Sequence, residues 1–287
     1  MFKIGTLADW FGVGLIEGIR ESQRCGASGV QIYAWNELNP YSVSHSELTE
    51  LKSVARECGQ EITALCGEIG GHGLARAEDN QTKLEYLKKT VDMAVTLECN
   101  VVTTHIGCIP EDANSAGYRT MLEACSEIGG YANEKGVYIA VETGPEPVER
   151  LVGFIKACGK GMAINYDPAN LVMVTGDDEV QGVYTGGRLI VHTHAKDGKC
   201  NVRVPAEHVY SIFAEGDIEA LTKTNYFTEY PLGQGDVRWP EYLRALRDIG
   251  YRGYLTIERE VSQDAGKDIK MAVDFLRKQL EQIFETK

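Results

Sequence analysis

The sequence lacks several patterns that would assign it to a common class of protein. Its eight cysteines include no C-x-x-C pair, so no spacing supports a zinc site built on cysteine. No apolar run is long enough to cross a membrane, and the opening M-F-K-I-G-T-L turns polar too early for a signal peptide. Scattered cysteines are typical of reduced, mostly buried thiols, and we therefore expect a cytoplasmic protein without a membrane partner.

Runs of Lys and Arg are also missing. The chain has 29 Lys and Arg against 42 Asp and Glu, which gives a net charge of −13. The negative electrostatic field of such a protein repels polyphosphates, so we expect no nucleic-acid partner. Hydrophobic residues make up 43% of the chain and charged residues 25%, as in ordinary globular proteins. With 287 residues the chain can bury a large core, and we expect residues 1–287 to form a single domain.

The chain contains a repeated unit in which an amphipathic segment ends at Gly or Asn and a β-branched apolar run follows. Glycine suits the left-handed position after a helix, and the apolar run suits a strand that is buried on both faces. The pattern predicts eight strands, which follow Met1, Cys25, Cys58, Cys99, Lys135, Cys158, Gly186 and Ile249.

The segments between the predicted strands have apolar residues at helical spacing. Alternating helices and strands imply parallel strands with right-handed crossovers. Eight such units predict an α/β fold of the (β/α)₈ TIM-barrel type. An open doubly wound sheet is the alternative, but no G-x-G-x-x-G follows the first strand. Helices are expected over residues 46–58, 82–97, 115–135, 147–158, 239–249 and 264–284.

The interval after the seventh strand is about thirty residues too long for a simple crossover. This insertion, residues 199–230, is rich in aromatic residues and leaves from the carboxyl end of a strand, where barrels carry their active-site loops. We interpret it as a lid or as a subunit contact, which would make the protein a homo-oligomer. A passive surface loop is the alternative.

Polar residues stand at the carboxyl ends of strands five to eight. Glu142, Asp167 and Glu258 would meet at one level of the barrel, where three carboxylates repel one another and lose hydration. A divalent cation resolves both costs. Three carboxylates and one neutral imidazole suit Mn²⁺, Mg²⁺ or Co²⁺, while Zn²⁺ usually takes more nitrogen or sulfur.

The seventh strand, L-I-V-H-T-H-A-K-D-G, offers two histidines for this site. Residues two apart on a strand share a face but lie roughly 6.5 Å apart along it. Only one imidazole can therefore reach the level of the carboxylates. His194 is closer to the carboxyl end and is the predicted ligand, and His192 is predicted to lie one layer deeper as a supporting group. The same argument places Asn165 below Asp167.

The motifs V-E-T-G, N-Y-D-P-A-N, H-T-H-A-K-D-G, P-L-G-Q-G-D-V-R-W and G-Y-L-T-I-E-R-E follow one another in the second half of the chain. This order resembles the sugar phosphate isomerase/epimerase superfamily with the xylose-isomerase-like barrel, over nearly the whole chain. The resemblance implies one metal ion, Mn²⁺ being favoured, held by Glu142, Asp167, His194 and Glu258. As in the ketose 3-epimerases of this fold, Glu142 and Glu258 would also be the acid/base pair. A ketose or keto-sugar would then react through an enediolate.

The chain departs from the ketose 3-epimerases at two positions. Those enzymes often carry a histidine three residues after the metal aspartate, where this chain has Asn170, and a glutamate where this chain has Val148. Glu146 is a candidate to replace that glutamate, and Asn170 a candidate to contact the substrate in place of the histidine.

Other candidate substrate contacts follow from position along the chain. They include Trp10 and Trp35, which would form an apolar wall after strands one and two unless they belong to the core. For Lys196 the alternative is an ion pair with Asp197. The full set of these candidates is Glu68, His72, His105, Lys196, Trp10 and Trp35.

Three other functions compete with the epimerase. A metal-dependent lyase, such as an inosose or dehydroshikimate dehydratase, would use the same enediolate and then lose a hydroxyl. An endonuclease IV-like phosphodiesterase would need more histidines, notably at Asn170, and the charge of −13 argues against DNA. A sugar-binding protein without catalysis would not need two ionised glutamates on the metal.

Overall fold

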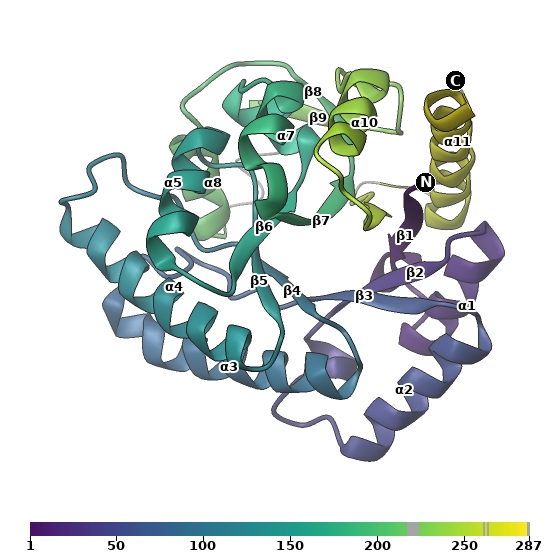
Figure 1. The fold of residues 1–287 in the computed structure, drawn as a ribbon, viewed down its shortest axis with the longest axis horizontal. Coiled ribbons are helices and arrows are strands. Elements are labelled where there is room, and N and C mark those ends of the chain that lie inside the picture. Colours follow the sequence, from purple (N-terminus) through teal and green to yellow (C-terminus); the bar gives the residue numbers. More distant parts are fainter. Residues whose placement is uncertain (217–223, 261, 263, 286–287) are drawn as a thin grey trace.

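Eight parallel strands close into a barrel in the computed structural model, which describes residues 1–216, 224–260, 262 and 264–285. Neighbouring strands follow one another along the chain, and the last pairs with the first (Figure 1). The predicted TIM barrel is therefore confirmed, and the open sheet is excluded. The barrel strands are β1 (Lys3–Leu7), β2 (Gly29–Tyr33), β3 (Glu61–Cys66), β4 (Val101–Thr104), β5 (Tyr138–Glu142), β6 (Met162–Tyr166), β7 (Ile190–Ala195) and β10 (Tyr254–Ile257).

Helices surround the barrel because each crossover buries one apolar face against the strands. Helix α2 begins where the Ser44 side chain accepts from the Glu47 N–H, and the Glu47 carboxylate accepts from the Ser44 N–H. The six predicted helices are present to within a few residues at most of their ends. The long crossover helices are α1 (Leu15–Cys25), α2 (His45–Glu57), α3 (Ala77–Thr96), α4 (Ala116–Glu134), α5 (Val148–Cys158), α7 (Glu179–Gly186), α10 (Trp239–Asp248) and α11 (Ala265–Glu285).

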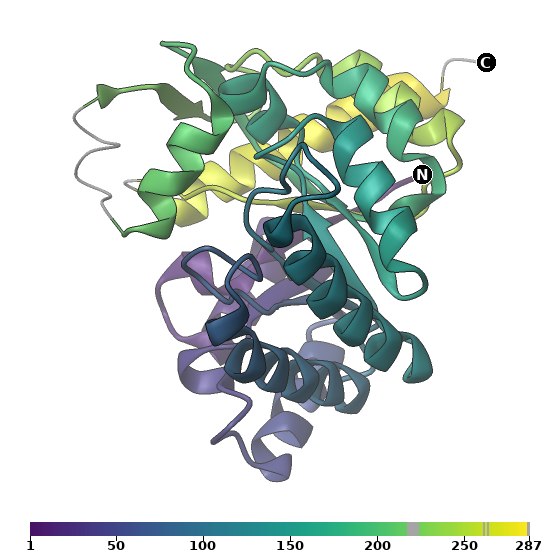
Figure 2. The same ribbon diagram turned by 90° about the vertical axis from the view of Figure 1, so that its left-hand side faces the viewer.

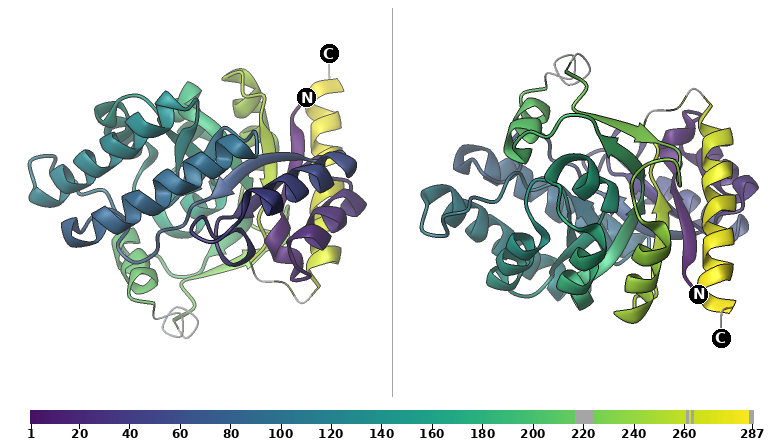
Figure 3. Two further views of the ribbon diagram at one scale, coloured as in Figure 1. Left: turned by 90° about the horizontal axis from the view of Figure 1, so that it is seen from below. Right: turned by 90° about the horizontal axis from the view of Figure 1, so that it is seen from above.

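Short helical turns occupy several loops, and η3 is a single π-helical turn directly after α6. Helix α11 runs beside β1 (Figure 3). Within the described residues, no helix is long and apolar enough to cross a membrane. All eight cysteines are free thiols. The short elements are η1 (Ala8–Phe11), η2 (Asn36–Leu38), α6 (Pro168–Asn170), η3 (Leu171–Thr175) and η4 (Gly187–Leu189).

The insertion after β7 is a hairpin that carries a helix. Strand β8 (Asp197–Cys200) pairs antiparallel with β9 (Phe227–Tyr230), and α8 (Ala206–Ala214) lies between them. Together they project from one side of the barrel (Figure 2). The paired base starts at Asp197, two residues before the predicted start of the insertion at position 199. Part of the predicted insertion, residues 217–223, lies outside the described residues.

The barrel interior is arranged in layers, because alternate residues of each strand point inward. Carboxylates and an imidazole occupy the carboxyl end. Beneath them lies a polar layer that includes Gln31, Asn165 and His192. The layer at the opposite end is small and apolar, with Ala64, Val101 and Ala140 in mutual contact. Most of the apolar core therefore lies between the barrel and its helices.

Candidate metal centre

Four side chains from four strand ends converge at the carboxyl end of the barrel. Glu142, Asp167, His194 and Glu258 are all buried, and each offers one ligand atom within 4.8 Å of the others. His194 Nδ1 lies 3.4 Å from Glu142 Oε2 and 3.2 Å from Glu258 Oε2. The structure thus brings together the four residues that the sequence predicted as metal ligands.

Two buried atoms of this cluster have no hydrogen-bond partner among the described residues, namely Asp167 Oδ2 and His194 Nδ1. A buried polar atom without a partner is costly. The other oxygen of Asp167 accepts from the Ala169 and Asn170 N–H groups at 2.8 and 3.4 Å. Asp167 therefore caps the turn at Pro168 with one oxygen and offers the second to the cluster. A divalent cation would satisfy both unpaired atoms, so the donor set fits a metal.

The orientation of the His194 ring is set from across the barrel. Gln31 of β2 donates through Nε2 to Thr103 Oγ1 at 3.2 Å, which directs Gln31 Oε1 to His194 Nε2 at 3.1 Å. When the neutral ring donates its Nε2 hydrogen to Gln31, the lone pair of Nδ1 points at the carboxylates. Gln31 is not among the residues predicted from the sequence, although a glutamine inside the apolar strand G-V-Q-I-Y was a usable signal.

Replacing Gln31 by Leu is expected to weaken divalent metal binding by about 10- to 100-fold, because the imidazole loses the acceptor that fixes its tautomer. Titration calorimetry with Mn²⁺ measures this change. Gln31→Glu keeps an acceptor and serves as the matched variant, with affinity closer to that of the original protein. Equal affinity in all three proteins would show that Gln31 does not orient His194.

His192 lies one layer deeper, as predicted from the spacing. Its Nδ1 contacts Asn165 Oδ1 at 2.9 Å and its Nε2 contacts Thr256 Oγ1 at 3.1 Å. Burial and the neighbouring His194 lower the pKa of His192 well below its usual value, so the ring stays neutral. Asn165 in turn donates to Glu142 Oε2 at 3.1 Å. His192 therefore supports the cluster through Asn165 and does not reach it directly.

The two glutamates have different neighbours. Asn170 Nδ2 donates to Glu142 Oε1 at 2.9 Å, and His105 Nε2 lies 3.7 Å from the same oxygen. Glu258 Oε2 instead accepts from Lys196 Nζ at 3.2 Å. Burial by itself raises the pKa of Glu258, but a protonated His194 and the Lys196 ammonium outweigh it and lower this pKa. Glu258 therefore stays ionised.

His105 and Glu68 form a pair beside Glu142. His105 Nδ1 lies 2.8 Å from Glu68 Oε2, and 38% of the His105 side chain remains exposed toward the mouth of the barrel. Burial lowers the pKa of His105, but Glu68 and Glu142 outweigh it and raise this pKa. Both predicted contacts thus lie next to the cluster. The third predicted contact of this group, His72, pairs through Nε2 with Glu215 Oε1 at 2.7 Å, beyond the end of α8.

Lys196 does not pair with Asp197, so this alternative is wrong. Its Nζ lies between Glu258 and Glu260, at 3.2 and 2.5 Å. Consecutive residues of an extended chain point to opposite sides, and Asp197 instead accepts from backbone N–H groups and from Trp239 Nε1. The buried Lys196 ammonium is thus held at the cluster.

Glu146 is buried, and its Oε2 accepts from the Ile109 N–H at 3.2 Å. Burial raises the pKa of Glu146 to about 8. The unfolded chain ionises this group near 4.5, so the folded state holds more protons between these values. The stability that the neutral carboxyl contributes is present below pH 4.5 and is lost as the pH rises to 8.

Glu146→Gln is therefore expected to stabilise the protein relative to the original chain at pH 9, by on the order of a few kcal/mol, and to change little at pH 5. Urea unfolding at pH 5, 7 and 9 measures the difference. Glu149→Gln, an exposed glutamate of the same segment, is the control and should show no such trend. A pH-independent difference for Glu146→Gln contradicts the prediction.

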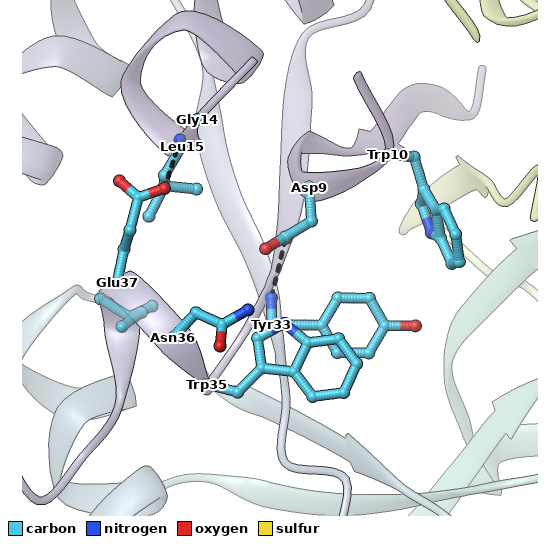
Figure 4. Close-up of a pocket in the computed structure, with 9 residues that line it drawn as sticks. Asp9, Trp10, Gly14, Leu15, Tyr33, Trp35, Asn36 and Glu37 are labelled. Atoms are coloured by element: carbon cyan, nitrogen blue, oxygen red, sulfur yellow. Dashed lines mark hydrogen bonds between the residues drawn. The ribbon is translucent and has the colours of Figure 1, made fainter. Parts of the chain in front are cut away.

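Trp10 and Trp35 do not belong to the core. They line a cavity of about 270 Å³ at the ends of β1 and β2, together with Asp9, Tyr33 and Glu37 (Figure 4). Tyr33 stacks on Trp35 with ring centroids 4.3 Å apart and meets Trp10 edge-on at 6.2 Å. Strand β1 pairs with β10, whose end carries Glu258, so this cavity lies beside the cluster.

Tyr210 of α8 is a residue whose place the sequence pattern did not predict. Its hydroxyl packs against Gly144, where a Cβ atom would lie only 1.8 Å from it, and its ring lies 6.5 Å from His105. Burial raises the pKa of Tyr210, and Glu142 and Asp167 raise it further. The insertion therefore brings a neutral phenol to the carboxylates, as a lid would.

The fold and the buried donor set define a TIM barrel whose strand ends form a centre that could bind a metal. A sequence model of the family described as "Xylose isomerase-like TIM barrel" matches residues 19–279, and the chain belongs to this family. An uncharacterized protein of Methanocaldococcus jannaschii is 25% identical over 205 residues, which are 67% of this chain. The match spans 62% of the length of that relative.

Solved structures share the fold. A xylose isomerase domain protein from Planctomyces limnophilus superposes with a TM-score of 0.80 at 24% identity, over 99% of this chain and 98% of its own. A D-psicose 3-epimerase solved with D-fructose gives 0.71 at 17% identity, over 97% and 99%. The probable 3-DHS dehydratase of Bacillus anthracis gives 0.74 at 17% identity, over 96% and 99%.

Proposed function

We propose that this protein is a metal-dependent isomerase or epimerase of a ketose or keto-sugar. The observation that carries the proposal is the placement of Glu142 and Glu258, which come from different strands and both contact His194 Nδ1 in one buried cluster. Two carboxylates that approach from different strands suit proton transfer on two faces of one carbon. The epimerase neighbour supports this choice with its fold.

Glu142, Asp167, His194 and Glu258 would hold one divalent metal, and three oxygens with one nitrogen favour Mn²⁺ over Zn²⁺, with Mg²⁺ and Co²⁺ also suitable. When bound, the metal would polarise the ketose carbonyl and stabilise negative charge on the substrate. One glutamate, ionised, takes the proton from the carbon next to that carbonyl. The other, protonated by solvent beforehand, returns a proton to the opposite face of the resulting enediolate. The Asn170 side-chain amide holds the Glu142 carboxyl group in position, and the Lys196 ammonium holds that of Glu258.

The cavity beside Glu258 suits an uncharged polyol. Asp9 and Glu37 provide hydrogen-bond acceptors for hydroxyl groups, and Trp35 provides an exposed ring surface. Trp10 Nε1 is buried without a partner among the described residues and could donate to a hydroxyl. Among the residues that the structure describes, no Lys or Arg lines this cavity. We therefore propose a substrate without a phosphate group, since two carboxylates would repel it.

A dehydratase is the second candidate, and Lys196 favours it. Loss of a hydroxyl from the enediolate needs a nearby acid, and the Lys196 ammonium lies 3.2 Å from Glu258 inside the cluster. The dehydratase neighbour has the same fold. Both candidates begin with removal of the same proton, so only the product separates them.

Incubation of the Mn²⁺- or Mg²⁺-loaded protein with a panel of ketoses and inososes in D₂O tests the proposal. NMR of the recovered, metal-free products should show deuterium at the carbon next to the carbonyl, together with the epimer or isomer. A dehydrated product would replace the proposal by the lyase. If no ketose or inosose of the panel takes up deuterium, the result would favour a protein that binds sugars without catalysis.

Tyr210 provides a test of the insertion as a lid. Tyr210→Phe removes one hydroxyl and is expected to raise KM by about tenfold while kcat changes less, because one hydrogen bond to the substrate is lost. The matched variant is Phe213→Leu, an exposed residue of the same helix. Steady-state kinetics on the accepted sugar measure both. Unchanged KM in Tyr210→Phe would assign the insertion to another role, such as the predicted subunit contact.

A further inference from the structure

A second cavity, of about 530 Å³, lies at the face of the barrel where the strands begin. Its walls are the starts of β4, β5 and β7 and the loop between α10 and β10. Val101 joins this cavity to the small apolar layer of the barrel interior, which it forms with Ala64 and Ala140. Tyr138 shares the inward face of β5 with Ala140 and Glu142, and its side chain is 43% exposed at this mouth.

Two arginines, Arg188 and Arg252, line this cavity. Each of the other twelve arginines has a carboxylate or a backbone carbonyl as its partner within the described part of the chain. Among the same residues Arg188 and Arg252 have neither. No Asp or Glu lines the cavity. In a protein with a net charge of −13, this concave surface is therefore locally positive.

We propose that this cavity binds a small oxyanion with at least two negative charges, of the phosphate or sulfate class. A guanidinium presents a planar fork of donors that matches two oxygens of such an anion. Arg188 precedes β7 and Arg252 precedes β10, and these strands are neighbours in the barrel, so one anion can accept from both. The Tyr138 hydroxyl, on β5, is a third donor that lines this cavity.

This site is separate from the metal centre and does not depend on the proposed function. The two lie at opposite ends of the barrel, and their linings have opposite charge. Asp9 and Glu37 line the cavity beside Glu258 without a cation, whereas Arg188 and Arg252 line this one without a carboxylate. We therefore expect an anion to bind in the cavity where the strands begin, although the cavity beside Glu258 repels anions.

Titration calorimetry with sodium sulfate and with inorganic phosphate tests the proposal, on the Mg²⁺-loaded protein at ionic strength held constant with sodium chloride. We expect one site with a Kd of about 1 mM or tighter. Arg188→Gln and Arg252→Gln should each weaken binding about tenfold, because each removes a charge-assisted contact. Arg244→Gln is the matched control, since this exposed arginine of α10 pairs with Glu241. Asp167→Asn should bind the anion as the original protein does.

Four outcomes overturn the proposal. The first is no saturable binding to the original protein. The second is equal loss of affinity in Arg244→Gln, which would show a diffuse charge effect. The third is loss of affinity in Asp167→Asn alone, which would place the anion at the metal centre. The fourth is a lower melting temperature of Arg188→Gln and Arg252→Gln without any change in anion affinity. This result would show that the two guanidinium groups stabilise the carboxyl ends of α7 and α10 and do not bind an anion.

Discussion

Replacing either Glu142 or Glu258 by Gln is expected to reduce turnover of the accepted sugar by about 1,000-fold, within the range that general acid–base groups contribute. Glutamine keeps an oxygen toward His194 Nδ1 but cannot take up a proton. Because the two carboxylates lie on different strands, each is expected to serve one face of the reacting carbon. Glu142→Gln and Glu258→Gln should therefore lose proton exchange with opposite epimers of the substrate.

This opposite pattern separates proton transfer from simple loss of metal. NMR in D₂O, started from each epimer in turn, measures the exchange, and the metal content of each variant is determined in parallel. Glu149→Gln, exposed on α5, is the control and should keep full activity. If both variants lose both exchanges together with their metal, the glutamates act as ligands only. If only one variant loses activity, the enzyme works on one face and is an aldose–ketose isomerase.

Alternation along strands explains how far the sequence could predict this site. Alternate residues of a barrel strand point inward, and the carboxyl ends of all strands lie at one face of the barrel. Glu142, Asp167 and Glu258 could therefore be placed at one level from the strand pattern alone. The two-residue spacing in H-T-H likewise separated His194 from His192. These inferences need only local geometry and the closed barrel.

Contacts across the barrel could not be predicted in the same way. Gln31 lies 163 residues before His194 in the chain, and only closure of the barrel places its amide against that imidazole. Tyr210 reaches Gly144 because an insertion folds back over the mouth, which no periodicity encodes. The failed pairing of Lys196 with Asp197 has a local cause, since the chain is extended there and turns the two side chains apart.

Asp197→Ala is expected to cost about 3–5 kcal/mol of unfolding free energy, because several donors lose the one acceptor that they share. The carboxylate is 1% exposed and accepts from the Gly233 and Val237 N–H groups at 2.8 and 3.2 Å. Trp239 Nε1 donates to it at 2.9 Å. Alanine would leave these donors in or near the core without an acceptor, and each such donor costs about 1–3 kcal/mol.

The contacts of Asp197 also connect stability to the site. They tie the loop that follows β9 to the end of β7, directly beside Lys196, so their loss should loosen the hairpin that carries α8. Urea unfolding measures the free energy, and limited proteolysis reports cleavage within the insertion. Asp197→Asn retains one acceptor oxygen and should lose about half as much unfolding free energy as Asp197→Ala. Asp236→Ala is the control, because that exposed aspartate pairs with Lys199 at the surface, at 3.7 Å. A loss below about 1 kcal/mol in Asp197→Ala would mean that water replaces the missing carboxylate.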